Sequence, residues 1–285
     1  MSIFVSTSCL SSIYSYPEIL DIYHHLCLDS VELGILSDPH IDIKKLIKKY
    51  NFNYTVHHYF PPPRKPFIIN LASQDKNILK KSVRQILSSI DFCSKFDIDL
   101  FSFHSGFRVD PDMYLRFSQK NIPPYEISFN TFKDSLVTIV DYAEEKNVKI
   151  AIENNVLSEY NLIKGQNKFL LMCEVSEFER LFKEILSHKL GVLLDLGHLK
   201  VTSNSLGFDK DTFIKKLQSN IYAVHVHENH GRVDEHNCPN KDSWSIEILV
   251  KYFNKKKLPI ILECKCNKIN NLETSLAILG NIIKN

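Results

Sequence analysis

The chain has 285 residues, of which 44% are hydrophobic, so one barrel-sized domain can bury a large core. Lys and Arg number 35 against 33 Asp and Glu, and the formal net charge of +2 excludes a global electrostatic drive toward nucleic acid or membrane. The apolar stretches are too short to span a bilayer and the first residues lack a basic signal region, while the seven cysteines are scattered without a Cys-x-x-Cys pair. We therefore expect a reduced, cytoplasmic protein in which Cys264 and Cys266 are thiols.

Short apolar runs of the kind that form buried strands recur along the chain. They lie at residues 3–7, 31–35, 54–58, 100–104, 149–153, 191–195, 221–227 and 258–263. The segments between them show helical apolar spacing, as at Ile78, Val83, Ile86, Leu87 and Ile90. Strands that alternate with helices predict a parallel sheet, and this number of repeats predicts an α/β fold in which residues 1–285 form a single (β/α)8 TIM barrel. An open doubly wound sheet is the alternative.

Two connections, residues 60–73 and 106–125, are longer than a barrel requires and are rich in proline. Both would leave the carboxyl ends of strands. We expect these stiffened loops to wall or cap a pocket rather than to be ordinary surface excursions.

Acidic and imidazole side chains stand at or just beyond the ends of the apolar runs. They are His57, His104, Glu153, Asp195, His198, His225, Asp234, His236 and Glu263. Because the active site of a barrel lies at the carboxyl ends of its strands, these residues predict a metal site in the barrel mouth.

Glu153, Asp195, His225 and Glu263 are the predicted core of that site. Carboxylates with one imidazole suit Mn, Mg, Co or Zn, and the lack of thiolate argues against a structural zinc cage. Such a metal would polarise a sugar carbonyl and acidify the adjacent C–H, leaving Glu153 and Glu263 to exchange the proton. That chemistry is the chemistry of an isomerase or epimerase.

Further metal positions are predicted from the remaining side chains. His198, three residues after Asp195, should reach the same pocket and could bind a metal with Asp234 and His236. His57 and His104 could hold another metal bridged by Glu153, so the site would hold one to three metals. The alternative for each histidine is a hydrogen-bonded core or rim residue.

Other residues near the predicted site are weaker candidates. Arg232 could grip a substrate phosphate and Trp244 could stack on a sugar, although a solvated charge and packing at a helix start are alternatives. His58 should point away from His57 by strand alternation, and His227 should lie beyond its strand, so both rank behind their neighbours.

The chain resembles the xylose-isomerase-like barrel superfamily, which contains endonuclease IV and the sugar phosphate isomerases and epimerases. The matching stretches cover essentially the whole length: 31–34, 56–60 with 70–73, 103–106, 152–154, 195–198, 225–236 and 262–263. In the endonuclease IV branch, residues that match all nine side chains bind three zinc ions and cleave DNA at abasic sites. In the isomerase branch, residues that match Glu153, Asp195, His225 and Glu263 bind one divalent metal, and the residue that matches His198 orients substrate.

The details of the resemblance favour the isomerase branch. The Val31-Glu-Leu-Gly run and the short loop from His225 to Asp234 resemble the isomerases, and the DNA-penetrating segment is replaced by the short, acidic residues 36–43. The first hypothesis is therefore a divalent-metal-dependent isomerase or epimerase of a small sugar or sugar phosphate. Because all nine ligand positions are retained, a trinuclear zinc phosphodiesterase is the alternative. A barrel that binds sugar or metal without turnover is the third hypothesis.

Overall fold

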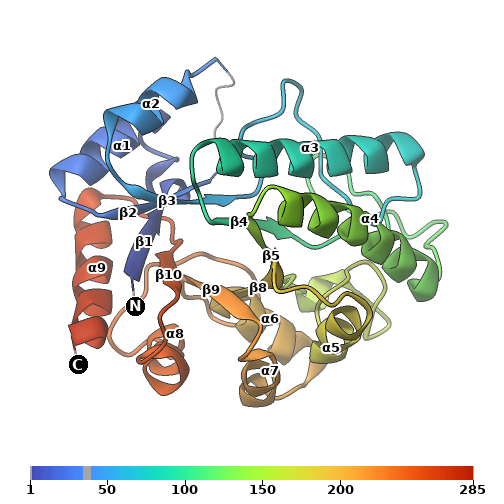
Figure 1. Ribbon diagram of the computed structural model, residues 1–285. Coiled ribbons are helices and arrows are strands. Elements are labelled where there is room, and N and C mark those ends of the chain that lie inside the picture. Colours follow the sequence, from blue (N-terminus) through green and yellow to red (C-terminus); the bar gives the residue numbers. More distant parts are fainter. Residues whose placement is uncertain (1, 35–39, 285) are drawn as a thin grey trace.

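The structure is a computed structural model that describes residues 2–34 and 40–284. Within these residues eight parallel strands close into a barrel in the order β1-β10-β9-β8-β5-β4-β3-β2 (Figure 1). The strands are β1 (Ser2–Ser6), β2 (Ser30–Leu33), β3 (Asn53–His57), β4 (Leu100–His104), β5 (Lys149–Glu153), β8 (Leu190–Asp195), β9 (Ile221–Val226) and β10 (Pro259–Leu262). The predicted TIM barrel is confirmed, and the open-sheet alternative is wrong because β1 pairs with both β2 and β10.

Each predicted strand overlaps one strand of the barrel, with differences at the ends. Ile35, the last residue of the predicted second strand, and residues 36–39 of the acidic segment lie outside the described residues. Glu263 follows β10 instead of ending it, and His227 follows β9. Both polar residues therefore stand at the carboxyl edge of the barrel, as expected.

Helices surround the barrel on its outer side (Figure 1). They are α1 (Tyr16–His25), α2 (Ile43–Lys49), α3 (Lys76–Lys95), α4 (Tyr125–Glu145), α5 (Val175–Glu184), α6 (Leu196–Leu206), α7 (Lys210–Leu217), α8 (Trp244–Ile248), continued by η3 (Leu249–Phe253), and α9 (Ile269–Lys284). Short elements add η1 (Thr7–Leu10), η2 (Glu159–Asn161) and the hairpin of β6 (Leu162–Ile163) and β7 (Gln166–Asn167).

Helix α3 illustrates why these segments are helical. The Asp75 side chain accepts hydrogen bonds from the backbone N–H groups of Asn77 and Ile78, which satisfies donors that the first turn leaves free. Ile86 and Ile90 are buried on one face at helical spacing, as the sequence predicts. No helix in the described part of the chain is both long and apolar enough to cross a bilayer.

The barrel interior explains how the strands aim polar side chains at one place. Phe4, Leu100, Ala151, Leu193, Ala223 and Ile261 form an apolar cluster inside the barrel. Because alternate residues of a strand share a face, the residues two positions after four of them point the same way. Those residues are Glu153, Asp195, His225 and Glu263. The apolar cluster is thus a floor on which the polar site stands.

Candidate metal centre

Four of the predicted ligands come together above this floor. Glu153, Asp195, His225 and Glu263 belong to or follow β5, β8, β9 and β10, which are consecutive around the barrel, and their ligand atoms lie within 4.8 Å of one another. His225 Nδ1 is central: it lies 2.9 Å from Glu263 Oε2, 3.7 Å from Asp195 Oδ2 and 3.8 Å from Glu153 Oε1. We name these residues the four-ligand group.

Buried atoms of this group lack hydrogen-bond partners. Both carboxylate oxygens of Glu153 and the Nδ1 atom of His225 are inaccessible and form no hydrogen bond within the described residues. A buried polar atom without a partner costs free energy, so these atoms fit a site in which a cation is the partner. The donor set of carboxylate oxygens and imidazole nitrogen suits a divalent metal.

The charges in the group favour metal binding. Burial raises the pKa of Glu153, but the imidazoles of His104 and His198 outweigh burial and hold that pKa well below its usual range. Burial lowers the pKa of His225, yet the carboxylates of Glu32 and Glu263 raise it well above its usual range. The centre therefore attracts positive charge, and a divalent cation can replace the protons on its imidazoles.

The other five predicted ligands complete two flanking groups. In the first, Glu153 Oε2 lies 2.9 Å from His104 Nδ1 and 3.5 Å from His57 Nε2. In the second, Asp234 Oδ2 lies 2.8 Å from His236 Nε2 and 3.3 Å from His198 Nε2. All nine side chains singled out in the sequence are thus in three adjoining groups, with Glu153 shared between the first and the four-ligand group.

Several histidines are held by bonds from the ring nitrogen that faces away from the groups. These bonds join His57 Nδ1 to Ser102 Oγ at 3.0 Å, His198 Nδ1 to Asn154 O at 3.0 Å, His225 Nε2 to Glu32 Oε2 at 3.0 Å and His236 Nδ1 to Glu263 O at 3.1 Å. Metal-binding histidines commonly use one nitrogen in this way, because the bond fixes the tautomer and the ring orientation. The bonds are what a metal centre needs.

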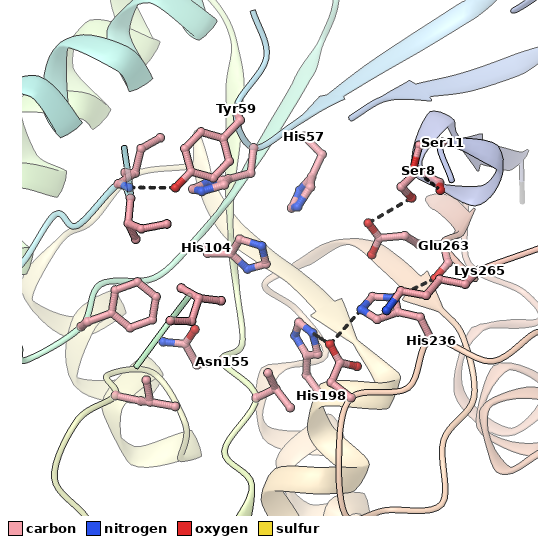
Figure 2. A pocket seen from close by; sticks show the side chains of 18 of the residues that line it. Ser8, Ser11, His57, Tyr59, His104, Asn155, His198, His236, Glu263 and Lys265 are labelled. Atoms are coloured by element: carbon pink, nitrogen blue, oxygen red, sulfur yellow. Dashed lines mark hydrogen bonds and ion pairs between the residues drawn. The ribbon is translucent and has the colours of Figure 1, made fainter. Parts of the chain in front are cut away.

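A cavity of about 560 Å³ opens above the groups (Figure 2). Its polar side includes His57, His104, His198, His236 and Glu263, which point toward a shared space, with Ser8 and Ser11 of η1 nearby. Its apolar side includes Ile68, Ile69, Phe107, Leu115, Phe117 and Leu170. The two proline-rich loops therefore line the pocket, as predicted.

The sequence matches the family described as "Xylose isomerase-like TIM barrel" over residues 28–282. The chain belongs to this family. It is 25% identical over 254 residues to the uncharacterized protein MJ1614 of Methanocaldococcus jannaschii, covering 88% of this chain and 85% of the relative. It is 26% identical over 237 residues to the probable endonuclease 4 of Aquifex aeolicus, covering 77% and 75%. A crystal structure of a D-tagatose 3-epimerase-like protein shares the fold with a TM-score of 0.76 at 23% identity, covering 100% of this chain and 97% of that one.

Within this xylose isomerase-like barrel, the two predicted substrate contacts lie elsewhere. Arg232 is exposed and is not part of the cavity wall. Trp244 begins α8, packs against the core and has Lys210 Nζ 5.5 Å from its ring, so it also lies outside the wall. Both predictions are corrected: position in a loop near the site did not fix which side of the loop faces the cavity. Among the described residues, Lys265 is the only lysine or arginine of the lining.

His58 and His227 were ranked too low. His58 lines the cavity beside His57, because β3 ends at His57 and strand alternation no longer applies. His227 joins the second flanking group: its Nε2 lies 3.0 Å from Asp195 Oδ1, and its ring stacks on His236 at 4.0 Å between centroids. Because His225 and His227 are two residues apart, alternation from His225 would have placed them on one face.

Glu32 is a third site residue that the sequence analysis did not assign. It is fully buried in β2, and its carboxylate binds His225 Nε2 across the barrel. The signal was available in the glutamate flanked by Val31 and Leu33, since a carboxylate inside a buried strand requires a partner.

Proposed function

We propose that the protein is a divalent-metal-dependent isomerase or epimerase of a small sugar or sugar phosphate. The observation that carries the proposal is the cavity of about 560 Å³ above the four-ligand group, whose size suits a small molecule. Its apolar wall and single cation, Lys265 among the described lining residues, fit a small polyol better than a polyanion such as DNA.

A bound Mn, Co, Mg or Zn ion would polarise the substrate carbonyl and acidify the neighbouring C–H. In the proposed reaction Glu263, which lines the cavity, and Glu153, which lies against His104, take up and return the proton. Ser8 Oγ donates to Glu263 Oε1 at 3.4 Å and so orients that carboxylate. His198 would orient the substrate, and Lys265 offers a charge for a phosphate.

The test is exchange of the substrate C–H hydrogen with solvent, followed by NMR in D2O over a panel of ketoses, aldoses and their phosphates. Glu153→Gln and Glu263→Gln should each abolish turnover and exchange on the substrate that the wild type converts, with the fold retained. Glu145→Gln is the matched control, because Glu145 is exposed at the end of α4, before the opposite edge of the barrel. Retained exchange in both site variants would refute the proposal.

A second candidate, a trinuclear zinc phosphodiesterase, is supported by the two flanking groups. A one-metal isomerase does not require His57, His104, Asp234 and His236 to be assembled as three adjoining ligand groups. If the zinc-loaded protein cleaves DNA at abasic sites, Asp234→Asn should lower that cleavage strongly. Absence of cleavage by the zinc-loaded wild type would dismiss this candidate.

We also propose a reduced cytoplasmic setting for the protein. The support is that all seven cysteines are free, including some whose sulfur atoms are in contact.

A further inference from the structure

Three cysteines form a cluster beside the candidate metal centre. Cys264 Sγ lies 3.2 Å from Cys238 Sγ and 3.6 Å from Cys266 Sγ, and Cys238 and Cys266 are 3.4 Å apart. Cys264 and Cys266 are buried, with 2% and 0% of their surface exposed, while Cys238 is half-buried. We call these residues the thiol cluster.

The backbone explains how the cluster is assembled. Cys264 and Cys266 follow β10 two residues apart, so an extended chain places them on one side. Cys238 comes from the loop after β9, which an isolated bridge between Glu228 and Asn237 holds in place. The result is three sulfurs from two segments converging on one point.

We propose that Cys238, Cys264 and Cys266 bind a thiophilic cation, Zn²⁺, at a site separate from the carboxylate and imidazole groups. In tetrahedral zinc sites with Zn–S bonds of about 2.3 Å, neighbouring sulfurs lie about 3.8 Å apart, so the cluster needs to expand by only a few tenths of an ångström. Three converging cysteines are the usual ligands of structural zinc.

Cys9 is the candidate for the fourth ligand. It is fully buried in η1, and its thiol interacts with the thiols of Cys264 and Cys266. The Cys266 N–H donates to Cys9 O at 2.9 Å, which holds η1 against the segment after β10. A zinc ion held by these four residues would join the first and last strands of the barrel to the loop after β9.

That position gives the zinc ion a structural role in the neighbouring site. Between the two cysteine-bearing segments, Lys265 N donates to His236 O at 2.7 Å and His236 Nδ1 bonds to Glu263 O at 3.1 Å. Occupation of the thiol cluster would therefore fix His236 and Glu263 relative to each other. No electron is exchanged: each ligating thiol releases a proton as the cation binds.

Cobalt substitution tests the proposal without reference to activity. Protein reduced, stripped with a chelator and loaded with Co²⁺ should show a thiolate-to-cobalt charge-transfer band in the near ultraviolet, which carboxylate and imidazole ligands do not give. Cys238→Ser and Cys266→Ser should lose the band, and in each the zinc content should fall by about one ion per chain. Cys27→Ser is the control, because Cys27 is exposed and outside the cluster.

Thiol alkylation supplies a second measurement that needs no variant. Mass spectrometry of the zinc-loaded and chelator-treated wild type should show Cys238 losing its reactivity with zinc while Cys27 reacts equally in both samples. Equal alkylation of Cys238 in both samples, together with no charge-transfer band, would overturn the proposal. A disulfide between two cluster cysteines in freshly purified protein, seen as a mass lower by two hydrogens and with no zinc bound, would overturn it as well.

Discussion

Gly197→Ala probes the packing beneath the second flanking group. A Cβ atom on Gly197 would lie 1.9 Å from His227 Cε1 and 2.4 Å from Nε2, far inside any tolerated contact. The ring of His227 has little room to withdraw, because it is fully buried, bonds to Asp195 at 3.0 Å and stacks on His236 at 4.0 Å. The substitution should therefore displace His227 and break its bond to Asp195.

The expected cost follows from these contacts. Overpacking a core site costs about 1–3 kcal/mol, and loss of a hydrogen bond to a charged group costs about 1.5–3 kcal/mol. Alanine in a helix returns up to about 1 kcal/mol, so Gly197→Ala should lower the free energy of unfolding by about 2–4 kcal/mol. Gly280→Ala makes the same change in α9, where the new Cβ has no atom within 4 Å, and should stabilise the protein by about 0.5–1 kcal/mol.

Urea unfolding followed by circular dichroism measures both variants, and zinc titration measures the effect on the flanking group that contains His227. Gly197→Ala should unfold at lower urea and bind zinc more weakly, while Gly280→Ala keeps wild-type binding. Wild-type stability and zinc binding in Gly197→Ala would show that the His227 ring is not held as described.

Three further outcomes are expected. Glu32→Gln should weaken metal binding to the four-ligand group about 10–100-fold in a chelator competition assay, because His225 loses the charged partner that orients it; unchanged affinity would contradict this. Metal removal should lower the melting temperature in differential scanning calorimetry, and reloading should restore it, since Glu153, Asp195 and Glu263 otherwise face one another without a cation; an unchanged melting temperature argues against a metal there. Burial lowers the pKa of His236, but Asp234 and Glu263 outweigh burial and raise it to about 9, so metal binding to its group should release protons and strengthen as pH rises toward 9; calorimetric titration on both sides of neutrality should show this, and equal affinities would refute it.

The sequence predicted the barrel and the nine assembled side chains because both depend on local pattern. A polar residue after an apolar run marks a strand's carboxyl end, and closure of the barrel brings such ends together. The contact of Glu32 with His225 was not predictable in this way, since the two residues are 193 positions apart and meet only across the barrel interior. The thiol cluster was missed for the same reason: Cys238 reaches Cys264 through a loop whose path no periodicity describes.

The two candidate functions make opposite demands on Glu153. Its Oε2 faces His104 and His57 in the first flanking group, and its Oε1 faces His225 in the four-ligand group. If metals fill both groups, each oxygen ligates a cation and the carboxylate is no longer available as a proton carrier. If only the four-ligand group is filled, Oε2 remains free to take a proton from the substrate. Metal content by inductively coupled plasma mass spectrometry therefore bears directly on the reaction: in the carboxylate and imidazole groups, one ion per chain is compatible with the isomerase, and three zinc ions are compatible with phosphoester cleavage.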